Sequence, residues 1–309
     1  VLKIVSREKP IKSGFSGVCR IVIISRVQDV FMTSSQSDYQ NLLADPDVAF
    51  AVELAMRAGA VLSDRPESLS IETKTSDTDV VTHMDQLAEE LIVSAIELSR
   101  PEDGLMGEEG AAKKSRSGRQ WVIDPIDGTI NYLYQLPHWC VSIALVEEDS
   151  RDGIVGVVYA PSLNSLFVGA NGKGAFRVVG EVATKLSVST EDRLGHSLVG
   201  TGFGYASERR AHQSQVLTHV LPNVRDIRRL GSCALDLCLV AAGELDAYFE
   251  RGVKPWDHSA GSLIVAQSGG VVSGLYGNRP SDAMIVAANR SIAPQLISIL
   301  EVNKADQGV

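Results

Sequence analysis

The residues whose types and spacing could do chemistry are acids that follow short apolar segments. The apolar run 121–123 ends on Asp124, and a second acid, Asp127, stands just before Gly128 and Thr129. A strand that ends in acids and then turns at glycine presents carboxylates and free backbone N–H groups at the edge of a sheet. That combination suits a divalent metal ion with a phosphate group bound to it.

Three further acids stand where a predicted strand or loop meets the next element: Asp85, Glu108 and Asp257. Together with Asp124 and Asp127 they would repel each other strongly in one cleft, so their convergence implies divalent cations. Oxygen ligands without a nearby cysteine favour Mg²⁺ or Mn²⁺ over zinc.

Each acid also has a simpler interpretation. Residues 124–129 fit a turn with polar caps, and Glu108 fits a solvated loop. Asp85 fits an acid that caps the free N–H groups of a helix start, and Asp257 fits the N-cap of its own helix. Only the joint order of the acids favours a metal site.

Helices and strands must position these acids. Asp45 and Pro46 predict the start of a helix that ends near Asp64. The polar segment 74–82 leads into a second helix, with Asp85 in its opening turn. The residues expected to be buried on this second helix are Leu87, Leu91, Ala95 and Leu98.

After residues 121–129, three apolar segments predict an antiparallel meander: 139–146, 153–159 and 165–168. After residue 187, predicted strands (198–201, 226–230, 246–250 and 284–288) alternate with predicted helices (211–220, 232–242, 257–267 and 292–300). This pattern indicates a layered α/β architecture with a subdomain boundary near residue 187.

Composition limits the possible partners. A net charge of −9 argues against a nucleic-acid surface, since phosphate backbones are held mainly by clustered Lys and Arg. The apolar run 18–24 is interrupted by Arg20, so a signal peptide or membrane span is not expected. The four cysteines form no C-x-x-C pair, which favours a reducing cytoplasm over a disulfide framework.

The first residues differ from the rest. Residues 1–31 hold six Lys/Arg against two acids, which gives them a net charge of +4. Because the whole chain has a net charge of −9, residues 32–309 have a net charge of −13. Met32 is typical of a natural chain start. We therefore expect residues 1–37 to be an extension outside the fold, and truncation at Met32 to leave activity intact. Residues 38–309 would form the catalytic domain.

Taken together, several segments resemble the inositol monophosphatase family of Mg²⁺-dependent, lithium-sensitive phosphatases. They are 107–109, 121–132, 136–139, 141–144, 229–232, 256–257 and 260–261, and the similarity covers most of residues 45–300. The resemblance implies an α+β sandwich of alternating helix and sheet layers, in two subdomains and often dimeric, with the metal ions in the cleft between the subdomains.

The resemblance also implies a set of metal ligands. Glu108, Asp124 and the backbone carbonyl of Ile126 would bind one Mg²⁺, and Asp124, Asp127 and Asp257 a second. A third, weaker ion would contact Glu108, and Mn²⁺ could replace Mg²⁺.

Further positions follow from the same resemblance. Gly128 and Thr129 would hold phosphate oxygens through backbone N–H groups, Asp85 with Thr129 would orient the attacking water, and Lys74 would stand at the rim. The residues that would face the substrate hydroxyls are Gly231, Ser232 and Glu250.

The expected reaction is hydrolysis of inositol 1-phosphate to inositol and phosphate by direct attack of a metal-bound water. Thr129 is not expected to be a nucleophile, because no histidine or lysine base stands in its motif. Glu250 favours a polyol substrate. Histidinol phosphate, 3′-phosphoadenosine nucleotides and fructose 1,6-bisphosphate remain alternatives within the superfamily.

Two other functions are less favoured. Gly202 and Gly204 lack the third glycine and the acid of a dinucleotide site. A regulatory binding protein that keeps the metal site only as a scaffold would not need every acid and the Thr129 hydroxyl intact, yet all of them are present.

Overall fold

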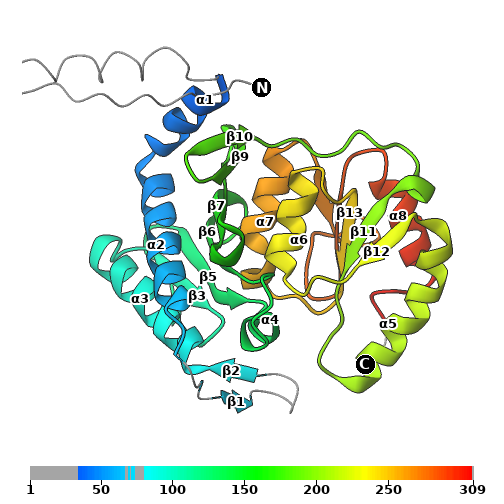
Figure 1. Ribbon diagram of the computed structural model, residues 1–309, viewed down its shortest axis with the longest axis horizontal. Coiled ribbons are helices and arrows are strands. Elements are labelled where there is room, and N and C mark those ends of the chain that lie inside the picture. The colour runs from blue at the N-terminus through cyan, green and yellow to red at the C-terminus, as the bar shows by residue number, and fades with distance from the viewer. Residues whose placement is uncertain (1–33, 67–68, 70, 74–79, 308–309) are drawn as a thin grey trace, which may run out of the picture.

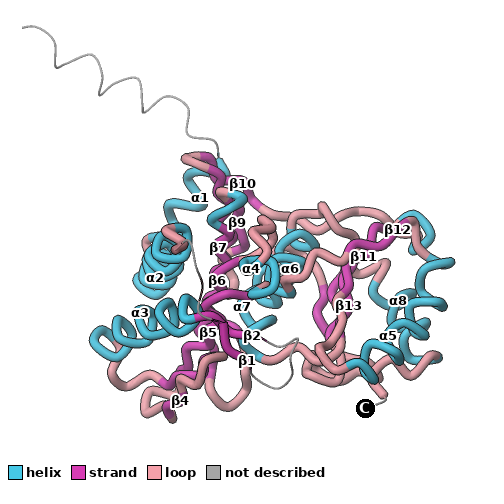
Figure 2. The backbone as a smooth tube through the Cα atoms, turned by 60° about the horizontal axis from the view of Figure 1, so that its bottom comes forward, coloured by secondary structure: helices cyan, strands magenta, loops and turns pink. Residues whose placement is uncertain are grey.

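The described part of the chain is built around five layers of helix and sheet (Figure 1). The computed structural model describes residues 34–66, 69, 71–73 and 80–307. In order, the layers are α2 (Pro46–Ser63) with α3 (His83–Ser99), a first sheet, α6 (Cys233–Ala241) with α7 (Pro255–Gln267), a second sheet, and α5 (Ser207–Val220) with α8 (Ala293–Val302). A second view agrees that α6 and α7 lie between the two sheets (Figure 2). The predicted layered sandwich is confirmed.

The first sheet contains β5, the strand that carries Asp124 and Asp127. Its strands run in the order β10 (Val182–Lys185), β9 (Gly174–Val179), β8 (Ser165–Ala170), β7 (Gly153–Ala160), β6 (Cys140–Glu147), β5 (Arg119–Asp127), β3 (Gly104–Gly107) and β4 (Ala112–Lys113). Neighbouring strands are antiparallel except β3 and β5. The predicted meander is therefore correct and continues through β9 and β10.

The second sheet belongs to the later part of the chain. Its order is β12 (Asp226–Arg228), β11 (Leu198–Thr201), β13 (Ala247–Glu250), β15 (Ile285–Ala288) and β14 (Val271–Ser273). The chain changes sheets between Lys185 and Leu198, which includes the predicted boundary near residue 187. However, α7 packs against β6, β7 and β8 of the first sheet, so the two parts share a core layer.

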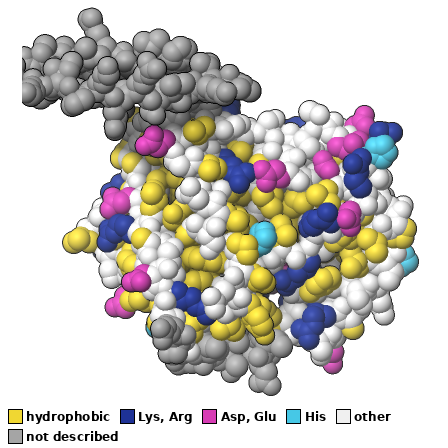
Figure 3. Space-filling view, viewed as in Figure 1, with side chains coloured by type: hydrophobic (Ala, Val, Ile, Leu, Met, Phe, Trp, Pro, Cys, Tyr) yellow, Lys and Arg dark blue, Asp and Glu magenta, His cyan; other side chains and the backbone are white. Residues whose placement is uncertain are grey.

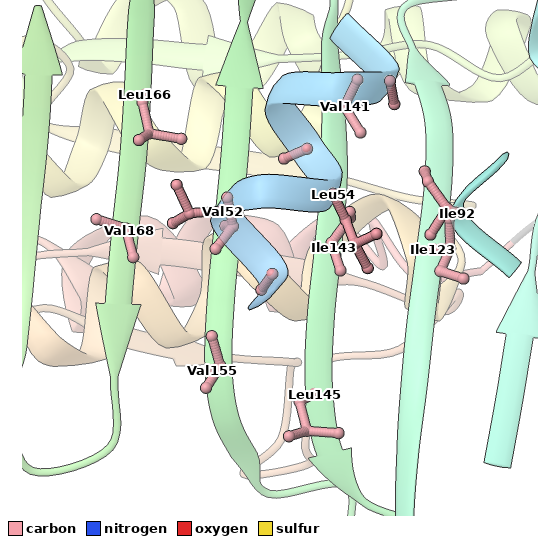
Figure 4. Packing of buried hydrophobic residues seen from close by; sticks show 14 of the residues in the cluster. Val52, Leu54, Ile92, Ile123, Val141, Ile143, Leu145, Val155, Leu166 and Val168 are labelled. Carbon is pink, nitrogen blue, oxygen red and sulfur yellow. The ribbon is translucent and has the colours of Figure 1, made fainter. Parts of the chain in front are cut away.

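Alternation of side chains gives β5 and β6 two buried faces. Ile123 and Ile143 join the cluster that includes α2 and α3, whereas Val122 and Ala144 join the cluster that includes α6 and α7. Figure 4 shows α2 crossing the strands, with Leu54 close to Ile143. A sheet covered on both faces places the end of β5 inside the molecule.

The prediction for the buried face of α3 was one residue out of phase. Leu87 and Leu98 are 46% and 86% exposed, and Leu91 and Ala95 lie half-buried at the flank. The buried residues of the helix include Met84, Ala88, Ile92 and Ile96. Two apolar stripes run side by side along this helix, and only packing against α2 and β5 decides which one faces the core.

A short helix before α2 extends the fold further toward the N-terminus than predicted. α1 (Ser34–Leu43) packs against β10, where Ser35 Oγ donates to the Ala183 carbonyl at 3.0 Å and the Gln36 side chain accepts from the Ala183 N–H at 3.0 Å. Residues 34–37 thus belong to the fold, whereas the prediction for 1–33 lies outside the described residues.

No described helix is both long and apolar enough to cross a membrane.

The contact between β7 and α7 gives a test of the layering. A Cβ at Gly156 would lie 2.6 Å from the Ala260 carbonyl oxygen. Overpacking of this kind should make Gly156→Ala lower the free energy of unfolding by about 1–3 kcal/mol in urea titrations. At Gly195 a Cβ would meet no atom within 4 Å, so Gly195→Ala should stay within about 0.5 kcal/mol. Equal values for the two variants would contradict the close approach.

Candidate active site

A bulge in β5 brings two of the predicted acids to the same face of the sheet. Asp124 pairs with Ser142 and Asp127 pairs with Cys140, so β5 has one residue more than β6 over this interval. Without the extra residue, side chains three apart would point to opposite faces. With it, both carboxylates share the side of the sheet that α6 and α7 cover, and they are only 1% and 8% exposed.

The start of α6 holds Asp127 in place. Its Oδ2 accepts hydrogen bonds from Ser232 Oγ at 2.7 Å and from the Ala234 N–H at 2.6 Å. Ser232 also caps α6 by accepting from the Leu235 N–H. The Ser232 hydroxyl, which was expected to face the substrate, therefore donates to a carboxylate of the site.

Asp257 reaches the same region from the first turn of α7. It is the third residue of the helix, and its Oδ2 accepts from the Lys254 N–H at 2.6 Å. The possibility that Asp257 is itself the N-cap was wrong, because Lys254 occupies that position. Asp257 still satisfies a free N–H group at the helix start, so its capping and site roles coexist.

Asp85 has the equivalent position on α3. Its Oδ2 accepts from the N–H and hydroxyl of Thr82 at 2.8 and 2.7 Å, which forms a capping box. Its other oxygen lies 3.3 Å from Thr129 Oγ1, and that hydroxyl also lies 3.0 Å from the Ile126 carbonyl. The structure therefore brings Asp85 and Thr129 together, as the resemblance implied.

Glu108 follows β3, and a buried residue that the sequence interpretation missed holds its loop. The oxygens of Glu89 on α3 accept from the Glu109 and Ala111 N–H groups, each at 2.9 Å. A Cβ at Gly107 would lie 2.3 Å from the Glu89 carboxylate, so a larger residue there would displace this carboxylate from its two N–H partners. The sequence offered one signal for Glu89, an acid next to the apolar residue Ala88 on the face of α3 that the structure buries.

The helix α4 (Thr129–Leu133) begins directly at the site. Gly128 has φ of 98°, and a Cβ there would lie 2.9 Å from the His138 carbonyl, so no other residue fits easily. The first N–H groups of α4 have no acceptor within the helix and can bind an anion. Arg65 donates to the carbonyls of Tyr132 and Leu133, which anchors the other end of α4. Phosphate binding here remains a prediction.

Asn131 is a second residue that was missed. Its Nδ2 donates to the His138 carbonyl at 2.5 Å and to the Leu230 carbonyl at 2.8 Å. This side chain ties α4 to the loop that carries Gly231, which has φ of 96°. Its position within residues 121–132 could have marked Asn131 as a candidate. Its structural role depends on Leu230, which is about a hundred residues away in the chain.

Glu250 ends β13 and lies against Gly202. A Cβ at Gly202 would lie 2.0 Å from a Glu250 oxygen, and the Tyr248 hydroxyl donates to that carboxylate. Gly202 thus makes room for Glu250 and is explained without a nucleotide. Burial raises the pKa of Glu250, although its hydrogen bond to Tyr248 and the Arg229 charge lower it.

On the face drawn in Figure 3, basic side chains gather between α6 and α5.

The charges of the site would be compensated by a cation. Burial, followed by the charges of Glu108, Asp127 and Asp257, raises the pKa of Asp124 well above its usual range. Burial also raises the pKa of Asp127 to about 7, against the lowering effect of its bonds to Ser232 and Ala234, and raises that of Asp257. Carboxylate oxygens that repel each other in a buried place suit Mg²⁺ or Mn²⁺, which would neutralise them.

The full ligand set is not assembled among the described residues. No three of their His, Cys, Asp or Glu side chains are arranged so that they could hold one metal ion. Asp127 and Asp257 instead direct an oxygen at nearby N–H and O–H donors. The ligand sets therefore stay predictions, and Lys74 lies outside the described residues.

Known proteins share this fold. Residues 43–305 match the inositol monophosphatase family. The chain is 39% identical to the inositol-1-monophosphatase SuhB of Mycobacterium tuberculosis, over 75% of this chain and 81% of the relative. It is 38% identical to the Nus factor SuhB of Xylella fastidiosa, over 82% and 94%. The solved structure of an IMPase from Thermotoga maritima has a TM-score of 0.75 at 30% identity, over 84% and 98%.

The raised pKa values predict how pH affects stability. The pKa of Asp127 rises from 3.8 to about 7, so without metal the folded protein holds protons that the unfolded chain has released, and its stability falls as pH rises through this window. Mg²⁺ must displace those protons at low pH. Added Mg²⁺ should therefore raise the melting temperature more at about pH 8 than at about pH 5.5.

Thermal unfolding with and without saturating Mg²⁺ measures this difference, with NaCl of matched ionic strength as the control. Equal increments at the two pH values would contradict coupling between these carboxylates and the cation.

Proposed function

Because the chain belongs to the inositol monophosphatase family, we propose that it is a Mg²⁺-dependent phosphomonoesterase that hydrolyses inositol 1-phosphate to inositol and phosphate. The family consists of metal-dependent phosphatases. The observation that carries the proposal is the bulge of β5, which turns Asp124 and Asp127 to one buried face beside the start of α4. The name of the Mycobacterium tuberculosis relative supports inositol 1-phosphate as the substrate.

Five residues would hold two or three metal ions. Glu108, Asp124 and the Ile126 carbonyl form the first set, and Asp124, Asp127 and Asp257 the second. When bound, these cations neutralise phosphate oxygens and make water a stronger nucleophile. The donors from α6 and α7 keep one oxygen of Asp127 and one of Asp257 occupied, so each carboxylate has a defined orientation.

The chain itself would bind and orient the reactants. The N–H groups of Gly128 and Thr129 would hold phosphate oxygens. The Asp85 carboxylate and the Thr129 hydroxyl, which lie 3.3 Å apart, would position the attacking water, and Asp85 could accept its proton.

The substrate's polyol would lie on the other side of the phosphate. Glu250 and the backbone around Gly231 would bind its hydroxyl groups, and Ser232 would contribute mainly by holding Asp127. Arg229 gives this side a basic group next to Glu250.

A second candidate function is a regulatory binding role. The Xylella fastidiosa relative is named a Nus factor, so a protein of similar sequence carries a name that does not describe catalysis. We also propose a homodimer in the cytoplasm, from the family resemblance and the sparse cysteines. Cys140, Cys233 and Cys238 are buried and form no disulfide.

Loss of one carboxylate should remove nearly all activity. Asp124→Asn is expected to reduce phosphate release on the order of a thousandfold at saturating Mg²⁺, because the proposed metal sites share this side chain. Asp236→Asn is the matched control, since burial also raises the pKa of Asp236 and so favours its neutral form. It should keep nearly full activity. Wild-type rates for Asp124→Asn would refute the site.

Substrate choice requires a panel of phosphomonoesters. We expect the highest kcat/KM for inositol 1-phosphate, with inhibition by Li⁺, and an increase in KM of about tenfold or more for Glu250→Gln, which loses a charged hydrogen-bond acceptor. A strong preference for histidinol phosphate would replace the proposed substrate. No Mg²⁺-dependent phosphate release from a folded sample would favour the regulatory role.

A further inference from the structure

A cavity of about 590 Å³ lies on a face of α7 that the proposed mechanism does not use. It is bounded by α7, the start of β7 and the segment 279–282. From α7 it is lined by residues that include His258, Ser259, Ser262 and Ala266. At 100° per residue these positions point away from Asp257, so the cavity and the proposed metal site lie on opposite sides of one helix.

The floor of the cavity combines apolar and neutral polar groups. Leu263 and Val272 contribute apolar surface. Ser262 Oγ lies 3.4 Å from His258 Nδ1, so both polar groups are oriented along the same side of the helix. The volume is in the range of small-molecule sites, and apolar surface on the α7 side is combined with polar and charged groups that could orient a ligand.

The charges around the cavity are unequal. Arg279 pairs with Asp152 at 3.1 Å and Lys254 with Asp282 at 3.3 Å, and all four side chains are well exposed. Such surface pairs contribute little and exchange partners easily. The third cation, Arg151, donates to the neutral amide of Gln120. Three cations thus face two acids, which favours an anionic ligand.

We propose that this cavity binds a small amphipathic anion, that is, an aromatic or branched aliphatic body carrying one carboxylate, sulfonate or phosphate group. The body would lie on the α7 floor beside Leu263 and Ser262. The acidic group would lie at the rim, where Arg151, Arg279 and Lys254 can reach it.

The cavity has a direct connection to the catalytic side of α7. Lys254 lines the cavity, and its backbone N–H donates to Asp257 Oδ2 at 2.6 Å. A ligand that draws Lys254 away from Asp282 would shift the start of α7 and thus Asp257. Occupancy of the cavity should therefore change metal affinity, a consequence that rests on the proposed function.

Binding is tested with 8-anilinonaphthalene-1-sulfonate by fluorescence titration, with Mg²⁺ and inorganic phosphate present to fill the catalytic site. Ser262→Trp fills the cavity and should weaken binding about tenfold or more. Ser94→Trp is the control, because it places the same side chain in a separate groove between α2 and α3. It should bind as the wild type does.

Ala266→Phe, at an exposed position of α7, is a second blocking variant in case Ser262→Trp does not fold. Wild-type binding by either blocking variant, with a native circular dichroism spectrum, would overturn the site.

The charge requirement is tested with N-phenyl-1-naphthylamine, which has the same aromatic body without the sulfonate. The wild type should prefer the sulfonate, and Arg279→Gln should reduce that preference several-fold. Equal affinities for the two probes in the wild type would overturn the assignment to an anion.

The connection to Asp257 has its own readout. Mn²⁺ affinity, measured by electron paramagnetic resonance of the free ion, should change several-fold when the sulfonate probe saturates the wild type but not Ser262→Trp. An unchanged Mn²⁺ affinity would refute the connection. Because neither this measurement nor the fluorescence titration depends on phosphate release, failure of the proposed phosphatase activity would be seen separately.

Discussion

The mutual repulsion of buried carboxylates is the constraint on which the rest of this structure depends. Asp124, Asp127 and Asp257 meet in a place where burial and like charge raise all three pKa values. Such a group is unstable unless donors or cations compensate it. The chain supplies part of the compensation from the first turns of α6 and α7, and we infer that divalent cations supply the rest.

Helix starts recur around the site for this reason. The beginnings of α3, α6 and α7 each direct N–H groups at an acid, and α4 leaves its own free N–H groups for an anion. In α3 and α7 the acid that caps the helix is also the acid proposed to act in catalysis. A capping interpretation and a catalytic interpretation of Asp85 and Asp257 therefore do not exclude each other.

Much of the fold could be predicted because its signals are local. The Asp45–Pro46 start of α2, the meander from β6 to β8 and the alternation after residue 187 depend on neighbouring residues. The errors occurred where packing decides. The buried face of α3 was assigned to Leu87 and Leu98, whereas contact with α2 and β5 selects the adjacent stripe. Glu89 and Asn131 were missed because their partners are distant in the chain.

By itself, the sequence determined the chemical class of this protein: oxygen-rich acids, a glycine before a short helix, and an order of motifs typical of one phosphatase family. Only the tertiary structure decided which way those acids point. Asp124 and Asp127 are three residues apart and would face opposite sides of a regular strand, and Pro125 alone does not reveal that the extra residue lies between them. Pairing with β6 introduces the bulge, and packing of α7 against that same face brings Asp257 to them.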